Sequence, residues 1–149
     1  MDKKATYELL LKQIRSLFEG ETDEIARMAN LTALLHGAMG FWWTGFYRCE
    51  GRELILGPFQ GPVACTRIPF GKGVCGTAWR EQKTLVVPDV DAFPGHIACS
   101  SESRSEIVVP LWKDGAVAAV LDIDSREKDN FDDTDRQYLE QIVALFDLK

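Results

Sequence analysis

Phe41-Trp42-Trp43-Thr44-Gly45-Phe46-Tyr47 is the stretch of sequence that decides the fold of this chain. It is rich in aromatic residues, which are enriched in β-strands. The apolar run Glu53-Leu54-Ile55-Leu56 follows it, and residues 49–52 between the two runs include Gly51. Two such runs joined by a short polar segment predict an antiparallel hairpin. The chain therefore changes near residue 41 from a helical pattern to a β-sheet.

Helical periodicity precedes this hairpin and returns at the end of the chain. Residues 3–18 and 22–35 carry apolar residues three and four positions apart, which is the spacing of one helical face. Thr22 is the expected N-cap of the second helix. A third helix is expected to begin near Asp132, whose carboxylate can cap it together with Asp135 three residues further on. We therefore expect two helices before the sheet and one after it.

The remaining strands are short and are separated by turn-rich segments. Strands are expected at residues 66–69, 84–87, 105–112 and 116–123, a short helix at 73–81, and irregular segments at 57–62 and 88–104. Lys113-Asp114-Gly115 predicts a hairpin between the last two strands. This order of elements predicts an α+β domain with a central, mainly antiparallel sheet of about six strands. The N- and C-terminal helices are expected to pack on one face, and loops are expected to cover a ligand pocket on the other.

The composition is that of one globular domain. The 149 residues are 46% hydrophobic and 27% charged, with a formal net charge of −6. This net negative charge argues against nucleic-acid binding, which requires a basic face, and against adsorption to an anionic membrane. No apolar run approaches the roughly 20 residues of a membrane span, and the first residues begin an amphipathic helix instead of a signal peptide. We expect a single domain over residues 1–149 in the cytoplasm, where cysteines are mainly reduced.

A cysteine in a loop is the first chemical signal. The Cys99 thiol lies in Gly95-His96-Ile97-Ala98-Cys99, and Ser105-Glu106 follows shortly after, so a histidine and a carboxylate are close in sequence. A reactive cysteine needs access, a stabilised thiolate and a proton source, which such a loop can supply. Cys65 and Cys75 also lie beside glycine-rich turns. Three thiols in or near loops suggest redox chemistry.

Two plainer interpretations of these thiols stay open at this point. Each cysteine can be a small buried hydrophobe. Alternatively, His96 and the three cysteines can hold zinc. Structural zinc sites favour cysteine pairs separated by about two to four residues, whereas Cys65, Cys75 and Cys99 lie ten and twenty-four positions apart. This spacing disfavours a zinc site.

Three features of the sequence, taken together, are specific enough to indicate a protein family. They are the Gly-His-Ile-Ala-Cys loop, the spacing of Cys65, Cys75 and Cys99, and the Leu121-Asp122-Ile123-Asp124-Ser125 segment. With them, the chain resembles the free methionine-(R)-sulfoxide reductases, which are single GAF-type domains. Further matching segments are residues 41–47, Leu56-Gly57-Pro58-Phe59-Gln60-Gly61, Ile68-Pro69, residues 71–77 and Ser105-Glu106-Ile107-Val108, so that the resemblance runs through most of the chain. A GAF fold alone implies only a ligand pocket, so the cysteines and carboxylates carry the functional expectation.

The resemblance implies an enzyme that reduces free L-methionine-(R)-S-oxide to methionine during oxidative stress. A thiolate attacks the sulfoxide sulfur and becomes a sulfenic acid, which a second thiol converts to a disulfide. By resemblance, Cys99 is the attacking cysteine and Cys65 the resolving one. Cys75 matches a third cysteine that is an alternative resolver or recycling thiol, and Cys49 lies outside the pattern. Thioredoxin is the expected external reductant, and neither a metal nor a bound cofactor is expected.

An acidic cluster is expected to bind the zwitterionic substrate. Asp122 and Asp124 project from the same face if residues 116–123 form a strand that continues. Carboxylates gathered on one concave surface push their pKa values apart, so that one of them can stay protonated as an acid. The resemblance implies that Glu106 and Asp124 bind the substrate ammonium group, while Asp122 steers the sulfoxide oxygen and the proton.

The remaining expected contacts surround the two other ends of the substrate. Trp43 and Tyr47 face one side of their strand and match pocket aromatics that would hold the S-methyl group. Backbone N–H groups of the loop, including those of Ile97 and Ala98, can bind the substrate carboxylate. His96 is expected to shape this loop, because the general acid is expected to be a carboxylate.

Two other functional classes are compatible with the sequence. The main alternative is a non-catalytic GAF sensor that binds a small molecule or reports on redox state through its cysteines, and the second is an interaction module whose thiols have no function. A homodimer through an amphipathic helix or a sheet edge is also compatible with the sequence, which does not decide the oligomeric state.

Overall fold

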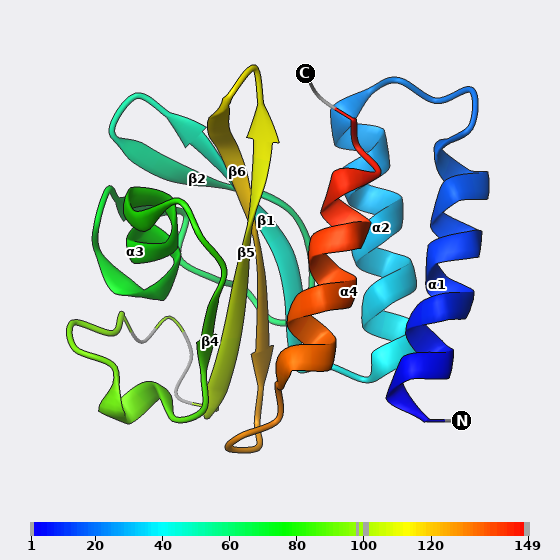
Figure 1. Ribbon diagram of the computed structural model, residues 1–149. Helices are drawn as coiled ribbons and strands as arrows, with labels where there is room; N and C mark the ends of the chain where they lie inside the picture. Colours follow the sequence, from blue (N-terminus) through cyan, green and yellow to red (C-terminus); the bar gives the residue numbers. More distant parts are fainter. Residues whose placement is uncertain (1, 98, 100–101, 148–149) are drawn as a thin grey trace.

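A six-stranded antiparallel sheet forms the centre of the molecule (Figure 1). The computed structural model describes residues 2–97, 99 and 102–147, and within them the strand order is β3-β2-β1-β6-β5-β4. The strands are β1 (Trp43–Glu50), β2 (Glu53–Gln60), β3 (Arg67–Pro69), β4 (Leu85–Val87), β5 (Ser105–Lys113) and β6 (Ala116–Ser125). All neighbouring strands pair antiparallel. The predicted α+β architecture is therefore confirmed.

The helices divide unequally between the two faces of this sheet. Helices α1 (Lys3–Phe18), α2 (Glu24–Met39) and α4 (Asp133–Ala144) cover one face, whereas α3 (Gly73–Glu81) lies on the other (Figure 1). A large apolar core fills the space between the sheet and the three helices; its fully buried members include Leu10, Leu35, Phe46, Ile123 and Leu139. The segment between β4 and β5, which contains the short 3-10 helix η1 (Val90–Ala92), runs on the same side as α3. Loops therefore occupy the face opposite the three packed helices, as expected.

The helix caps largely follow the sequence signals. The bounds of α1 and α3 are those predicted. Asp132 caps α4 in a capping box, because its side chain accepts from the backbone N–H of Asp135 while the Asp135 carboxylate accepts from the backbone N–H of Asp132. The predicted cap of α2 is wrong by one residue. Asp23, not Thr22, accepts the N–H of Ala26 at 2.9 Å, since its carboxylate is a stronger acceptor facing the helix N-terminus.

The predicted loop at residues 57–62 is wrong in its first part, because β2 continues through Gly57 to Gln60. The register of the β1–β2 pair shifts between Gly45 and Tyr47, and this irregularity accommodates the proline in β2. Gly45 faces Phe59 across the pair. A Cβ at residue 45 would lie 2.5 Å from the Phe59 Cβ and 2.5 Å from the Trp43 ring. Only glycine at this position lets the two aromatic side chains close over β1.

The hairpin between β5 and β6 forms where the sequence predicted it. Asp114 and Gly115 have φ angles of +53° and +80°, which is the left-handed backbone of a type I′ turn. Asp and Gly tolerate this region better than most residues. The backbone twist of such a turn also matches the right-handed twist of the two strands that it joins. The turn itself is shorter than predicted, because β5 includes Lys113.

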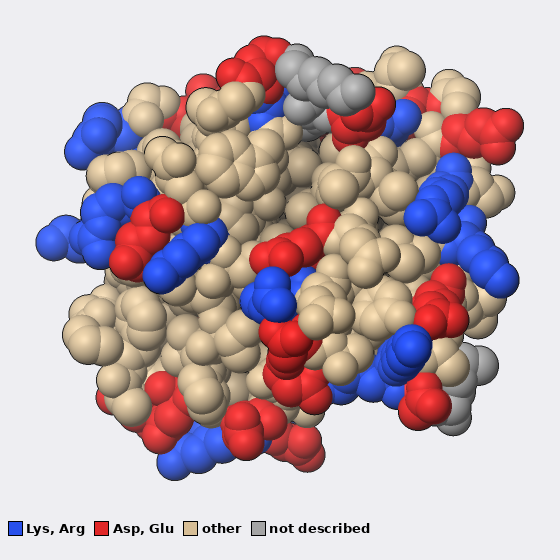
Figure 2. Space-filling view, in the orientation of Figure 1, with Lys and Arg blue, Asp and Glu red and all other residues tan. Residues whose placement is uncertain are grey.

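The surface on the side shown in Figure 2 carries both signs of charge. Lys and Arg side chains are interspersed with Asp and Glu across this view, which has the orientation of Figure 1. The net charge of −6 is therefore not gathered into one patch on this face. Among the helices of the described residues, none is long and apolar enough to cross a membrane.

Candidate active site

A pocket lies between α3 and the sheet, on the face away from α1, α2 and α4. Its walls come from β1, β5 and β6, from the first turn of α3, and from the loops that follow β2 and precede β5. It is lined, among others, by Trp43, Tyr47, Cys75, His96, Ile97, Cys99, Glu106, Asp122 and Asp124. Residues from distant parts of the sequence therefore meet in one cavity beneath the loops.

Aromatic rings on β1 form one wall of this pocket, a ring on β2 packs behind them, and they support the loop after β2. The Trp43 ring stacks on Tyr47 and on Phe59, with centroids 5.9 and 5.3 Å apart. The polar ends of the rings hold the loop after β2: the Trp43 Nε1–H donates to the Pro62 carbonyl at 3.0 Å, and the Tyr47 hydroxyl donates to the Cys65 carbonyl at 2.8 Å. The same side chains therefore present an apolar wall and fix the backbone of Cys65.

A disulfide between Cys65 and Cys99 joins the two loops that border the pocket. The two Cα atoms are 5.4 Å apart, within the usual range for this bond, although 34 positions separate the residues in sequence. Both residues are half-buried. Cys49 and Cys75 are free thiols. The structure is therefore that of an oxidised form, and the intramolecular disulfide expected between Cys65 and Cys99 is present.

The acidic side chains gather because of a bulge in the β5–β6 hairpin. A regular two-residue turn that pairs Lys113 with Ala116 would place Glu106 opposite Ile123. The register instead shifts by one residue between Leu111 and Trp112, so that Glu106 pairs with Asp124. Directly opposed residues of an antiparallel pair share a face, and a shift of one residue changes the face. The bulge therefore brings Glu106 to the side of the sheet that carries Asp122 and Asp124.

Burial and mutual repulsion disfavour the charged forms of these carboxyl groups. Glu106 and Asp122 are each only 5% exposed, and Asp124 is half-buried and accepts a hydrogen bond from the Ser103 hydroxyl at 3.2 Å. Burial and the neighbouring carboxylates raise the pKa of Glu106 and of Asp124 well above their usual values. Burial also raises the pKa of Asp122. The cluster can therefore hold protons at a pH where exposed carboxyl groups are ionised.

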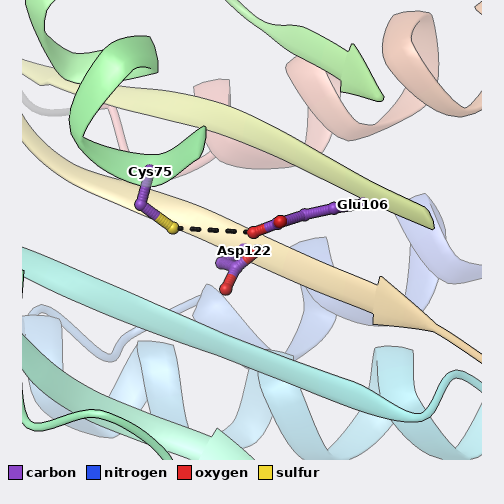
Figure 3. Close-up of side chains that lie close together, drawn as sticks. All are labelled: Cys75, Glu106 and Asp122. Atoms are coloured by element: carbon purple, nitrogen blue, oxygen red, sulfur yellow. Dashed lines mark hydrogen bonds between the residues drawn. The ribbon is translucent and has the colours of Figure 1, made fainter. Parts of the chain in front are cut away.

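Cys75 and His96 complete the polar part of the pocket. Figure 3 shows Cys75 from α3, Glu106 from β5 and Asp122 from β6 pointing toward one another. The Cys75 Sγ donates to Glu106 Oε2 at 3.9 Å, and His96 Nε2 lies 3.8 Å from Glu106 Oε1. Burial and the three carboxylates raise the pKa of the Cys75 thiol well above its usual value. Cys75 is therefore a protonated hydrogen-bond donor to the acidic cluster and a poor nucleophile in this state.

Comparison with known proteins places this geometry in a family. The GAF domain model matches residues 22–147. A GAF domain-containing protein A of Dictyostelium discoideum is 56% identical over 97% of this chain and 92% of its own length. The free methionine-R-sulfoxide reductase of Escherichia coli is 46% identical over 97% of this chain and 88% of its own. This chain belongs to the free methionine-R-sulfoxide reductase family of GAF domains.

A solved structure from this family has the same fold over almost the whole chain. The X-ray structure of the free methionine-R-sulfoxide reductase of Neisseria meningitidis, in complex with its substrate, superposes with a TM-score of 0.96. The two sequences are 54% identical over 98% of this chain and 89% of that one. The family resemblance expected from the sequence is thereby confirmed.

The structure brings together most of the residues that the family resemblance singled out. Eight of them line the pocket, namely Trp43, Tyr47, Cys75, Ile97, Cys99, Glu106, Asp122 and Asp124, and Cys65 is bonded to Cys99. Ala98 lies outside the described residues. In this oxidised form the four-residue zinc set considered from the sequence is not available, because two of its thiols form the disulfide. The assigned roles of the individual side chains remain predictions.

Ser103 and Trp42 line the pocket and were not predicted from the sequence. Ser103 is 8% exposed and binds Asp124, and the only available signal was a polar run just before β5. Trp42 lies in the same aromatic stretch, but it is an odd number of positions from Trp43 and Tyr47. Because side chains alternate between the faces of a strand, this spacing predicts that Trp42 faces away from the pocket. Its ring lies 4.7 Å from the Arg126 guanidinium and still borders the cavity.

Proposed function

We propose that this protein reduces free methionine-R-sulfoxide to methionine with its own thiols. The observation that carries the proposal is the Cys65–Cys99 disulfide beside a pocket lined by three carboxyl groups. A homologue with a nearly identical fold and 54% sequence identity was crystallised as a free methionine-R-sulfoxide reductase with its substrate. In the reaction, the Cys99 thiol and the sulfoxide give a Cys99 sulfenic acid and methionine.

Cys65 is the second thiol of the reaction and reduces the Cys99 sulfenic acid by forming the disulfide. Its thiol attacks the sulfenic sulfur, forms the S–S bond and releases the oxygen as water. Overall, two thiols and one sulfoxide give one disulfide, one thioether and one water. The hydrogen bond from Tyr47 to the Cys65 carbonyl holds this cysteine beside the pocket. Cys75 does not share this role in our proposal, because burial keeps it protonated next to Glu106.

The acidic cluster supplies both a counter-charge and a proton. The substrate ammonium group binds Glu106 and Asp124, and its positive charge favours the ionised forms of these two groups. The proton that the coupled cluster retains then lies on Asp122, which donates it to the sulfoxide oxygen as the S–O bond breaks. The rings of Trp43 and Tyr47 contact the S-methyl group. Backbone N–H groups of the loop, including that of Ile97, bind the substrate carboxylate.

The reduced enzyme is regenerated by a thioredoxin-type dithiol in the cytoplasm. We assign the attack of the reductant to Cys65, whose loop includes Val63, which is 88% exposed, whereas Cys65 and Cys99 themselves are both half-buried. An external thiolate can attack Sγ of Cys65 and leave Cys99 as the departing thiol. No metal or bound cofactor takes part in this cycle.

A count of thiols distinguishes this enzyme from a GAF sensor that binds the same ligand. The chain has four cysteines, of which Cys49 and Cys75 are free in the oxidised form. We expect the reduced, reductant-free protein to fall from four thiols to two when one equivalent of methionine-R-sulfoxide is added, as measured by thiol titration after denaturation. Methionine, which binds without an S–O bond to reduce, is the matched control and should leave four thiols. A count of four with the sulfoxide as well would indicate a non-catalytic binder.

A further inference from the structure

The pocket contains a set of ligand atoms that the proposed thiol chemistry does not use as a unit. One atom from each of Cys75, Glu106 and Asp122 lies within 4.8 Å of the other two (Figure 3). The Cys75 Sγ is 3.9 Å from Glu106 Oε2. Zinc bonds of about 2.0 Å to oxygen and about 2.3 Å to sulfur separate tetrahedral ligands by about 3.3–3.5 Å. The three side chains therefore lie close to coordination spacing and need only a small contraction.

The second observation is an orphaned oxygen in this cluster. Asp122 is only 5% exposed and lines the pocket, and its Oδ1 has no hydrogen-bond partner among the described residues. A buried carboxylate oxygen without a donor is costly unless a cation or another partner reaches it. Of the groups that act on the Asp122 carboxyl, Glu106, Asp124 and Cys75 cannot supply positive charge, and His96 does so only when its imidazole is protonated. A cation bound here would therefore supply the partner that Asp122 Oδ1 lacks.

A fourth candidate ligand lies on the loop side of the cluster, outside the three atoms that lie within 4.8 Å of one another, and it must move toward them to reach the same ion. His96 lines the same pocket, and its Nε2 lies 3.8 Å from Glu106 Oε1. One thiolate, one imidazole and two carboxylates form a ligand set suited to a thiophilic divalent ion, whereas Mg²⁺ and Ca²⁺ prefer oxygen ligands alone. The Cys65 and Cys99 sulfur atoms are not required, since they are bonded to each other.

We propose that Zn²⁺ binds in this pocket through Cys75, Glu106 and Asp122, with His96 as the fourth ligand. The ion occupies the carboxylates that the proposed function assigns to substrate, so metal and substrate exclude one another. Zinc is thus an inhibitor of the pocket and not a cofactor of the reaction. Coordination replaces the Cys75 S–H bond by a metal–thiolate bond, and the thiol proton and any proton held by Glu106 or Asp122 are released to solvent.

The test uses the oxidised protein, without reductant, so that neither turnover nor the Cys65 and Cys99 thiols contribute. Cd²⁺ serves as a spectroscopic substitute for zinc, because a thiolate–cadmium bond gives an ultraviolet charge-transfer band. We expect the band to saturate at one equivalent and to disappear when Zn²⁺ is added in competition. Cys49→Ser is the matched control, since this other free cysteine lies outside the pocket, and it should keep the band.

Two variants locate the ion. Cys75→Ser should abolish the band, and Glu106→Gln should keep it while weakening affinity more than about 10-fold. Circular dichroism and thermal midpoints establish that each variant is folded. No saturable band in the Cys49→Ser protein, or an unchanged band in Cys75→Ser, would overturn the proposal whatever the enzyme's activity. Because the measurement needs no sulfoxide, its failure leaves the proposed reductase function standing.

Discussion

Replacing Cys99 by serine is expected to abolish turnover, lowering kcat by at least about 10³-fold. The hydroxyl of serine is not a soft nucleophile toward sulfur and cannot form a sulfenic acid. Serine differs from cysteine by one atom, and the residue is half-buried in a loop, so the fold should persist. The assay measures methionine formed from free methionine-R-sulfoxide, with thioredoxin, thioredoxin reductase and NADPH as the recycling system.

Cys65→Ser provides the informative contrast. It should form one methionine per site and then stop, leaving a Cys99 sulfenic acid that a trapping reagent can label. Adding Cys75→Ser should not change this result, since Cys75 is buried and hydrogen-bonded to Glu106. Cys49→Ser should behave as the unmodified protein. Normal steady-state turnover in Cys99→Ser would refute the assignment of the nucleophile, and turnover in Cys65→Ser that depends on Cys75 would reassign the resolving thiol.

Replacing Asp122 by asparagine is expected to slow the chemical step by about 10²-fold or more. Asparagine keeps the size of the side chain but cannot donate the proton that the departing oxygen requires. The rate is measured in a single turnover, so that recycling by thioredoxin does not limit it. Asp124→Asn is the matched control on the same strand, and it should mainly raise KM, because Asp124 is assigned to the ammonium group.

The pH dependence separates a proton donor from a residue that only shapes the pocket. Burial raises the pKa of Asp122. Because the protonated form is the active one, the single-turnover rate should be high below this raised pKa and should fall as pH increases through it. Asp122→Asn should lose this falling limb. An unchanged rate in Asp122→Asn, or a falling limb that persists in it, would contradict the role of general acid.

The sequence predicted the elements of this fold better than their ends. The aromatic run in β1 and the Asp114-Gly115 turn have strong local signals, because strand propensity and positive φ angles are properties of single residues. The extension of β2 through Gly57 and Pro58 was missed. Both residues are typical of turns, and only the irregular register against β1 lets them stay in a strand.

The assembly of the site depended on features that no local pattern contains. The spacing of Asp122 and Asp124 predicts their common face, but Glu106 reaches that face only through the register shift near Leu111. Likewise, nothing in a separation of 34 positions indicates that Cys65 and Cys99 meet. These expectations came from the family resemblance. The hydrogen bonds that fix the Cys65 loop, from Trp43 and Tyr47, became visible only in the structure.

The most direct test of the proposed reductase function follows each epimer of free methionine sulfoxide separately. The reduced protein, with a thioredoxin recycling system, is incubated with the racemate, and chiral chromatography measures the R epimer, the S epimer and methionine over time. We predict that the R epimer disappears, that methionine appears in equal amount, and that the S epimer remains. Formation of no methionine, or equal loss of both epimers, would contradict the account.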